Sequence, residues 1–187
     1  KILLKQAYLF NVKNIIITDK KKFLEIKNKL SKEKIKVFNN FDDLDKIFKN
    51  KIDYTMSAIS GLNGLIPTMR IIKFTKIIAI ANKESIICAW NLIKKELTKR
   101  KTNFIPVDSE HFSIWSIIGE TPKYKIDEII ITASGGPFLK FPLNKFNKIT
   151  INSALKHPNW SMGKKISIDS ATMMNKVFEV IEAKNIF

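Results

Sequence analysis

Two acidic side chains near the middle of the chain, Asp108 and Glu110, have the spacing of a divalent cation site. They follow the apolar residues 103–107, which have the composition of a β-strand, and a spacing of two lets both side chains point to one side. Paired carboxylates are ligands that Mg²⁺ and Mn²⁺ prefer. A turn followed by an acid at a helix N-terminus is the more common explanation of such a pair, and a third carboxylate is needed to favour a metal site.

A third carboxylate is available in the C-terminal segment, which has helical periodicity. Asn175, Glu179 and Glu182 fall on one face of the expected helix, and Lys176 lies beside them. A polar helix face exposed to solvent gives the same pattern. Glu179 is therefore a candidate metal ligand, but the helical pattern alone does not distinguish a metal site from a solvent-exposed face.

Several polar residues have the types and positions expected of a phosphate site. Ser134 opens a Ser-Gly-Gly turn after an expected strand, where backbone N–H groups and a hydroxyl can bind an anion. Ser170 is expected at a helix N-terminus, whose dipole favours anions, and Asn175 and Lys176 follow inside that helix. Each of these features is more often an ordinary turn or helix cap.

A loop with a histidine and a tryptophan, residues 157–165, has the composition of a substrate lid. His157 precedes a proline, and Trp160 precedes Gly163. An indole can cover a ligand and exclude water from it. Tryptophans in such loops are also common as packing residues.

Short β-type runs alternate with helical patterns up to residue 119, which predicts an α/β fold with a partial, mostly parallel, doubly wound sheet. Strands are expected at residues 14–18, 35–38, 54–59, 76–81 and 103–107, and helices at residues 20–30, 41–48, 65–72, 83–100 and 112–118. Ligands of such sheets collect beyond the carboxyl ends of the strands. The turns at residues 61–64, 82–85 and 108–110 lie there, but no Gly-x-Gly-x-x-Gly segment occurs.

The pattern changes after Gly119, and we place a domain boundary near residue 107. A dinucleotide-type unit is expected over residues 1–107, and the first part of an α+β unit over residues 108–187. In the second unit we expect strands at residues 126–133 and 166–168, short helices at 142–151 and 152–156, and a final helix to about residue 185. Asp169 or Ser170 is expected to cap that helix.

The composition raises one further hypothesis, a polyanionic partner. The 187 residues include 33 Lys and Arg against 17 Asp and Glu, a formal net charge of +16. However, only Arg70 and Arg100 are arginines, which nucleic-acid-binding proteins favour, and the lysines are scattered. The apolar runs are too short to cross a bilayer, and the single cysteine, Cys88, fits a reducing compartment. We expect neither a nucleic acid nor a membrane as partner.

Four motifs in the chain resemble the 1-deoxy-D-xylulose 5-phosphate reductoisomerase family. They are ANKES at residues 81–85, PVDSEH at 106–111, ASGGPF at 133–138, and a long stretch from ALKHPNWSMG at 154–163 to DSATMMNK at 169–176. The motifs follow the family's order, and the resemblance extends over essentially the whole chain.

The resemblance implies a partial Rossmann-like NADPH-binding domain followed by the start of a catalytic domain. It implies rearrangement and reduction of 1-deoxy-D-xylulose 5-phosphate to 2-C-methyl-D-erythritol 4-phosphate, in non-mevalonate isoprenoid biosynthesis, with NADPH and Mg²⁺, Mn²⁺ or Co²⁺. Asp108, Glu110 and Glu179 would hold the metal and act in catalysis with Lys83. The substrate-binding residues would be Ser109, Ser134, His157, Trp160, Ser170, Asn175 and Lys176. The cofactor-binding residues would be Asn82, Glu84, Met162 and Gly163, with Trp160 and Met162 in the lid.

The sequence departs from the family in two ways. Val177 and Phe178 stand where the family usually has Gly-Leu, and the added bulk predicts weaker metal or substrate binding. The family's N-terminal Gly-rich segment and the C-terminal part of its catalytic domain have no counterpart, so we expect no measurable turnover from these residues alone. The family also implies a homodimer for the full-length enzyme, in a bacterial cytoplasm or a plastid-type organelle.

Two alternatives stay open from the sequence. One is a non-catalytic basic α/β module that binds phosphorylated ligands or nucleic acid, with binding that survives loss of Lys176. The other is a metal-dependent phosphotransferase or aldolase that uses the same three carboxylates without a nicotinamide.

Overall fold

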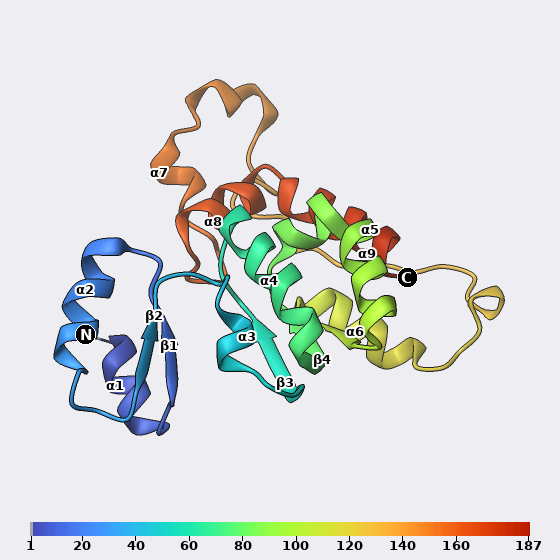
Figure 1. Cartoon of the computed structure of the whole chain (residues 1–187). Coiled ribbons are helices and arrows are strands. Elements are labelled where there is room, and N and C mark those ends of the chain that lie inside the picture. Colours follow the sequence, from blue (N-terminus) through green and yellow to red (C-terminus); the bar gives the residue numbers. More distant parts are fainter. Residues whose placement is uncertain (1) are drawn as a thin grey trace.

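The strands run parallel, but they form two sheets rather than one (Figure 1). The computed structural model describes residues 2–187, without the side chain of Lys123. β1 (Asn14–Ile16) pairs with β2 (Lys36–Phe38), and a second sheet has the order β3 (Ile52–Ser57), β4 (Thr75–Ile80), β5 (Asn103–Pro106). The prediction of a mixed α/β fold with parallel strands is confirmed. Within the described residues, the break between β1 and β3 divides the expected sheet.

A small N-terminal unit surrounds the first sheet. It contains α1 (Ile2–Leu9) and α2 (Lys20–Lys29), and its core consists of Leu4, Ala7, Ile15 and Leu30. Asp19 caps α2 by accepting a hydrogen bond from the Lys22 N–H at 2.9 Å. α1 was not among the helices expected from the sequence, although Asn11, in the left-handed conformation at φ 49°, follows its end.

A larger unit is built on the second sheet. It contains α3 (Leu44–Ile47), the 3₁₀ turns η1 (Leu62–Gly64) and η2 (Ile72–Phe74), α4 (Leu65–Ile71), α5 (Lys83–Arg100) and α6 (Ser109–Ile118). Its core joins β4 to α5 through Ile72, Ile78, Ile80, Ile86, Trp90, Ile93 and Leu97. Burial of these apolar side chains fixes α5 against the sheet and so fixes the position of its first turn.

The C-terminal segment has more irregular structure. It contains the 3₁₀ turns η3 (Lys123–Lys125) and η4 (Leu143–Lys148), and the helices α7 (Ile151–Ala154), α8 (Lys164–Ala171) and α9 (Met174–Ile186). The segment around η4 and α7 protrudes from the body, whereas α9 lies along α5 (Figure 1). α9 also packs against α6, so elements distant in sequence meet there.

Three predictions for the C-terminal segment are wrong. Residues 126–133 form no strand, because their alternating pattern meets no partner strand among the described residues. Residues 166–168 lie inside α8, where the Ser167 hydroxyl donates to the Gly163 carbonyl at 3.1 Å in a helical contact. Asp169 and Ser170 therefore lie near the end of α8 and do not cap α9, which begins after Met173 in the left-handed conformation at φ 60°.

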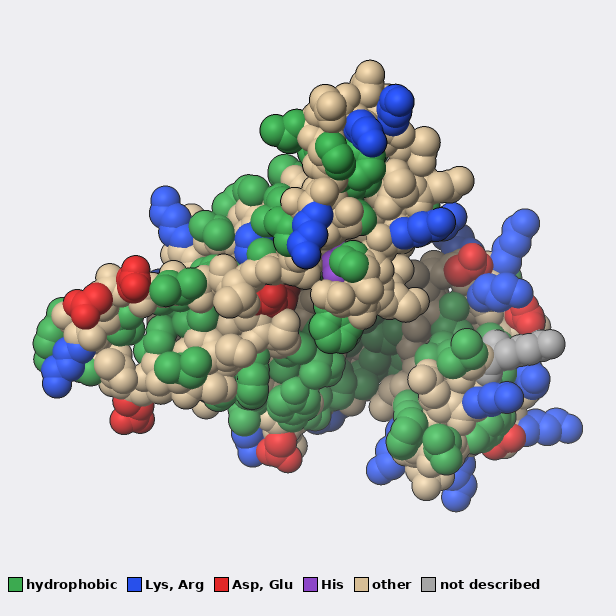
Figure 2. Space-filling model, turned by 180° about the vertical axis from the view of Figure 1, so that it is seen from behind, with side chains coloured by type: hydrophobic (Ala, Val, Ile, Leu, Met, Phe, Trp, Pro, Cys, Tyr) green, Lys and Arg blue, Asp and Glu red, His purple; other side chains and the backbone are tan. Residues whose placement is uncertain are grey.

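The basic residues form no single band on the face shown in Figure 2, where they are scattered over the N-terminal unit and the protruding segment. This distribution agrees with the scatter of lysines along the sequence. None of the helices in the described part of the chain has the length and apolar character needed to cross a membrane.

Candidate active site and metal centre

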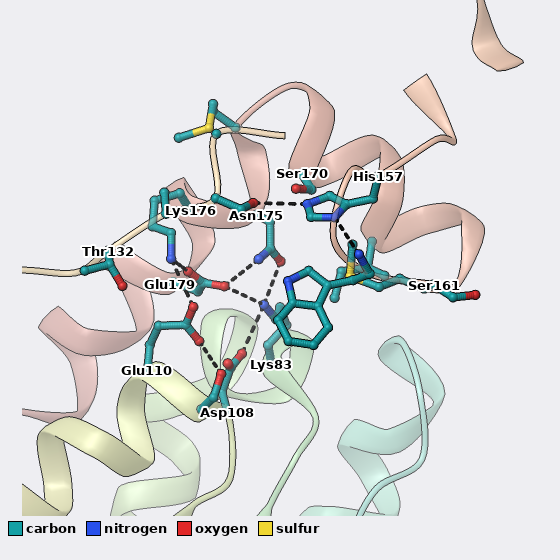
Figure 3. Close-up of a pocket in the computed structure, with 18 residues that line it drawn as sticks. Lys83, Asp108, Glu110, Thr132, His157, Ser161, Ser170, Asn175, Lys176 and Glu179 are labelled. Atoms are coloured by element: carbon teal, nitrogen blue, oxygen red, sulfur yellow. Dashed lines mark hydrogen bonds and ion pairs between the residues drawn. The ribbon is translucent and has the colours of Figure 1, made fainter. Parts of the chain in front are cut away.

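A cavity of about 460 Å³ lies where α5, α6 and α9 meet the loops at residues 132–135 and 157–162. Figure 3 shows polar side chains from all of these segments pointing into it. The expected site residues that line it are Lys83, Asp108, Ser109, Glu110, Ser134, His157, Trp160, Met162, Ser170, Asn175, Lys176 and Glu179. The fold thus gathers nearly all of the expected site residues in one place.

Three carboxylates meet on one wall of this cavity. Asp108 occupies the N-cap position of α6, Glu110 lies in the first turn of α6, and Glu179 projects from α9. One oxygen from each lies within 4.8 Å of the others. Asp108 and Glu110 converge because the chain turns from β5 into α6, and not because both belong to a strand. Asp108 makes no capping hydrogen bond, so its carboxylate is free to face the cavity.

Two ammonium groups neutralise part of this negative charge. The Lys83 Nζ lies 3.1 Å from the Asp108 Oδ2 and 3.7 Å from the Glu179 Oε1, and donates to the Asn175 Oδ1 at 2.8 Å. The Lys176 Nζ donates to the Glu110 Oε1 at 3.1 Å and also contacts the Glu179 carboxylate. Both lysine side chains are largely buried, so the Coulomb attraction within these ion pairs is stronger than in exposed pairs.

The contacts shift two of these ionisation equilibria. Burial acts to raise the pKa of Glu110, but the hydrogen bonds that Ser109 and Lys176 donate to it outweigh burial and lower that pKa to about 2. Burial likewise acts to lower the pKa of Lys176, yet the hydrogen bonds to Glu179 and Glu110 raise it. At neutral pH the site therefore contains an ionised Glu110 and a charged Lys176.

The acidic face of α9 is its buried face. Glu179 and Glu182 are the buried residues of this helix, whereas Met174, Val177 and Val180 are exposed. The alternative of a polar stripe in solvent is therefore wrong. Val177, with 46% of its surface exposed, does not line the cavity, so its bulk gives no steric reason for weaker metal or substrate binding.

The donor set fits a divalent cation of the Mg²⁺ or Mn²⁺ type. Three carboxylates within 4.8 Å of one another, with no sulfur ligand, match the oxygen preference of these ions. The two lysines balance only two of the three negative charges, which leaves the cluster with a net charge that favours a cation.

The opposite wall has the features of an anion site. The His157 Nδ1 accepts backbone N–H bonds from Asn159 at 3.2 Å and Trp160 at 3.1 Å, so in the neutral ring the proton belongs to Nε2. That Nε2 lies 3.0 Å from the Ser134 Oγ and donates to it. The Ser134 hydroxyl can then turn its own hydrogen toward a bound oxygen in the cavity.

Ser170 reaches the same cavity from an unexpected position. It lies in the last turn of α8 rather than at a helix N-terminus. The prediction that a helix dipole assists anion binding at Ser170 is therefore wrong. The backbone of Gly136, at φ 65°, lies close to Ser170: a Cβ on Gly136 would lie 2.6 Å from the Ser170 carbonyl oxygen. The first turn of α9, with Asn175 and Lys176, supplies the helix N-terminus instead.

The four residues expected to bind the cofactor are divided between two adjoining cavities. Asn82, Glu84 and Gly163 line a second cavity of about 400 Å³, which shares Lys83, Ile166 and Asn175 with the first. Met162 lines the first cavity. The two cavities are therefore adjacent, as the binding sites of a cofactor and a substrate that react with one another must be.

The Asn82 side chain hydrogen-bonds to backbone groups of the protein itself. Its Nδ2 donates to the carbonyls of Ile59 at 2.5 Å and Gly61 at 2.9 Å, and its Oδ1 accepts from the Ser85 N–H at 2.6 Å. With 2% of its surface exposed, Asn82 has no side-chain group left for a ligand. It caps α5 and ties the loop after β3 to the helix that carries Lys83.

Some cavity-lining residues were not predicted from the sequence. They are Thr132, Ala133, Gly135, Ser161, Ile166 and Met173, of which Ala133, Gly135 and Ser161 also belong to the motifs. Met173 is part of the DSATMMNK motif, so the motif could have found it, whereas Thr132 and Ile166 are placed only by the fold.

Comparison with known proteins gives one family throughout. Residues 1–90 match the family model described as 1-deoxy-D-xylulose 5-phosphate reductoisomerase, and residues 104–187 match the model of its C-terminal domain. The chain is 67% identical over 189 residues to the reductoisomerase of Pelagibacter ubique, covering 100% of this chain and 49% of that protein. The enzyme of Wolbachia pipientis from Culex pipiens is 43% identical over 187 residues, with 48% of its length covered. The chain thus spans about half the length of these relatives.

Solved structures give the same result. A reductoisomerase from Zymomonas mobilis in complex with NADPH superposes with a TM-score of 0.88 at 37% identity, covering 100% of this chain and 48% of that chain. A reductoisomerase in complex with NADPH, fosmidomycin and magnesium gives a TM-score of 0.81 at 34% identity, with 99% and 48% coverage. Sequence motifs, family models and fold agree, and the chain belongs to the 1-deoxy-D-xylulose 5-phosphate reductoisomerase family.

Proposed function

We propose that this chain provides the metal- and substrate-binding part of an enzyme that converts 1-deoxy-D-xylulose 5-phosphate to 2-C-methyl-D-erythritol 4-phosphate, with NADPH and a divalent metal. The observation that carries the proposal is a single cavity with three carboxylates on one wall, Ser134 and His157 on the opposite wall, and Lys176 beside the carboxylates. Binding of a sugar phosphate needs both groups of residues. The carboxylates would hold a metal that activates the sugar's hydroxyl and carbonyl oxygens, and the cationic and hydroxyl donors would bind its phosphate.

At the reacting end, Asp108, Glu110 and Glu179 would hold the metal. A divalent ion bound there supplies Lewis-acid polarisation of the substrate's carbonyl and hydroxyl oxygens. Lys83 is aimed at the same point from α5, and its ammonium can donate to a hydroxyl of the substrate when it leaves Asp108. The Ser109 hydroxyl, which donates to the Glu110 Oε2 at 2.7 Å, is adjacent and can orient the neighbouring substrate oxygen.

At the phosphate end, Ser134, Ser170, Asn175 and Lys176 surround the space beside His157. The His157 Nε2–H fixes the Ser134 hydroxyl, so that its hydrogen is available to a phosphate oxygen. Lys176 contributes a positive charge, and the first turn of α9 contributes backbone N–H groups. Binding of the non-reacting phosphate in this way helps to position the carbon atoms at the opposite wall.

The nicotinamide of NADPH would occupy the adjoining cavity between Glu84 and Gly163. NADPH, when bound, supplies the hydride that reduces the rearranged aldehyde. Trp160, with 66% of its surface exposed at the edge of the first cavity, is placed to cover both ligands when the loop closes. Closure over the site would exclude water and strengthen the electrostatic contacts inside.

The organisation of the longer enzyme is also a proposal. We infer a division near residue 107 into an NADPH-binding part, 1–107, and a catalytic part, 108–187; the separate family models at residues 1–90 and 104–187 support it. We further propose a homodimer. The bacterial origin of the relatives, Pelagibacter, Wolbachia and Thermoanaerobacter, supports a bacterial rather than a plastid location.

Titration of the chain with 1-deoxy-D-xylulose 5-phosphate in a calorimeter, with and without Mg²⁺, tests this function. We expect Mg²⁺-dependent binding that is lost in Asp108→Asn and retained in Asp127→Asn, a matched change at an exposed acid. Absence of binding in both conditions would contradict the proposal. Salt-dependent DNA binding that survives Lys176→Ala would favour the non-catalytic alternative. A product formed without NADPH would favour a phosphotransferase or aldolase.

A further inference from the structure

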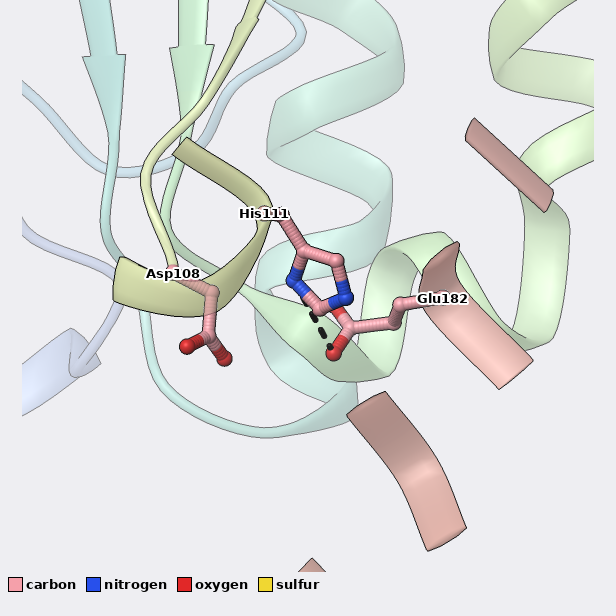
Figure 4. Close-up of side chains that lie close together, drawn as sticks. All are labelled: Asp108, His111 and Glu182. Atoms are coloured by element: carbon pink, nitrogen blue, oxygen red, sulfur yellow. Dashed lines mark ion pairs between the residues drawn. The ribbon is translucent and has the colours of Figure 1, made fainter. Parts of the chain in front are cut away.

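A second group of side chains lies beneath the three carboxylates, and the proposed reaction does not use it. His111 on α6 and Glu182 on α9 are fully buried, and each has a ligand atom within 4.8 Å of one on Asp108 (Figure 4). Three of their polar atoms have no hydrogen-bond partner among the residues that the structure describes: His111 Nδ1, Glu182 Oε1 and Glu182 Oε2. Unpartnered buried polar atoms are costly, so an arrangement that keeps three of them together calls for an explanation.

A second cation site explains the cluster poorly. Neither His111 nor Glu182 lines the cavity that contains the carboxylates, and both are sealed from solvent. One imidazole nitrogen is already engaged, because the His111 Nε2 lies 2.8 Å from the backbone carbonyl oxygen of Glu179. A cation would therefore have neither a route of entry nor a complete set of ligands.

The contact with Glu179 settles how the His111 ring is oriented. A carbonyl oxygen only accepts hydrogen bonds, so Nε2 carries the hydrogen and donates it. In a neutral ring Nδ1 is then an acceptor, and it faces the Glu182 Oε2 across 3.9 Å. That distance is too long for a hydrogen bond but requires only a small movement of α9 to become one.

We propose that His111 and Glu182 are a pair of positioning residues that hold α9 at the rotation needed for Glu179 to face Asp108 and Glu110. His111 binds the backbone of Glu179 itself, and Glu182 lies one helical turn further along α9. When Glu182 donates to the His111 Nδ1, α9 is fixed to α6 at two points one turn apart. This inference rests on the metal site proposed above.

The protonation of Glu182 supports this arrangement. Burial raises the pKa of its carboxyl to about 8, with the Asp108 and Glu179 carboxylates adding to the shift and Lys83 opposing it. A neutral carboxyl has the O–H that an acceptor nitrogen requires. A glutamine at this position would offer an N–H in its place, whereas a leucine of similar size would offer no donor.

Mn²⁺ binding measured by electron paramagnetic resonance, on the chain itself, tests the proposal. Glu182→Leu is expected to weaken binding roughly 10- to 100-fold, as loss of a group that supports a metal ligand does, and Glu182→Gln to change it less than about threefold. His111→Leu removes both contacts and should weaken binding at least as much, and the double variant should be no worse than His111→Leu alone. Equal affinities for the wild-type chain and Glu182→Leu would overturn the proposal.

The outcomes separate this inference from the proposed function. If the wild-type chain does not bind Mn²⁺, the metal site itself is wrong and the inference falls with it. If Glu182→Leu does not fold, as judged by circular dichroism, the ¹⁵N resonances of His111 in the wild-type chain decide. A proton on Nε2 with Nδ1 as a hydrogen-bond acceptor supports the pair, and a proton on Nδ1 contradicts it.

Discussion

The Lys83 ammonium lies 3.1 Å from the Asp108 carboxylate, so the first residue of α5 is joined to the N-cap of α6 by an ion pair. The two residues are far apart in sequence but both follow neighbouring strands, β4 and β5, of the same sheet. Parallel strands place the starts of their following helices at one edge. The same contact places a protein cation where a metal ion is expected to bind.

Replacing Lys83 by methionine is therefore expected to tighten Mn²⁺ binding, by about tenfold if removal of the competing ammonium is worth ~1.4 kcal/mol. The metal-free protein should become less stable, because Asp108 and Glu179 lose their counter-charge. Mn²⁺ titration and thermal unfolding in a chelator measure the two effects. Lys94→Met, an exposed change on the same helix, is the control and should do neither. Weaker Mn²⁺ binding in Lys83→Met would contradict the expectation.

Replacing Lys176 by alanine is expected to weaken binding of the sugar phosphate roughly tenfold or more, because a charge-assisted hydrogen bond is lost. Calorimetric titration with 1-deoxy-D-xylulose 5-phosphate in Mg²⁺ measures the loss. Lys184→Ala removes an exposed lysine from the same helix and should leave the affinity unchanged. An equal loss in both variants would mean that only the general positive charge of the chain matters.

The raised pKa of Glu182 makes a prediction about stability and pH. The folded chain keeps the Glu182 proton up to about pH 8, whereas the unfolded chain loses it near the ordinary glutamate pKa of 4.5. Between these values the folded state binds more protons, so this group makes the free energy of unfolding fall as pH rises, by at most about 1.4 kcal/mol per unit. Glu182→Gln should remove this decline. Denaturant unfolding of the wild-type and Glu182→Gln chains between pH 5 and pH 8 measures this decline. The same dependence of the free energy of unfolding on pH in both chains would contradict the prediction.

Gly136 is expected to tolerate no side chain. At φ 65° an alanine is strained, and its Cβ would lie 2.6 Å from the Ser170 carbonyl oxygen, so Gly136→Ala should cost about 1–3 kcal/mol of stability. Gly163→Ala is the control, because no atom lies within 4 Å of the added Cβ and its φ is ordinary. Urea unfolding of the two variants compares them. The idea fails if both lose the same small amount.

The elements that could be predicted from sequence are those with strong local signals. The helix after β4 was expected at residues 83–100 and is found there, where the structure shows that Asn82 caps it. Residues 166–168 were misread as a strand because alternating isoleucine and serine in so short a window fits either period, and the packing of α8 decides between them. Residues 126–133 have a strand pattern, but a strand also needs a neighbour to pair with, which a pattern does not provide.

The candidate site was predictable to the extent that residue type determines chemistry. The types of Asp108, Glu110 and Glu179 allowed a metal site, and the family resemblance implied it; the fold brings one oxygen of each within 4.8 Å of the others. The commitment of Asn82 to backbone carbonyls could not be foreseen, because its partners Ile59 and Gly61 lie in another loop. The pairing of His111 with Glu182 depends likewise on the packing of α6 against α9.

The two lysines beside the three carboxylates also imply an order of binding. With Asp108, Glu110 and Glu179 ionised and Lys83 and Lys176 charged, the cluster carries a net charge of one negative unit, which repels a phosphate dianion. A divalent cation reverses the sign to one positive unit, and the same cavity then attracts the dianion. The charge balance therefore favours arrival of the metal first, and a sugar phosphate encountered without metal meets a repulsive site.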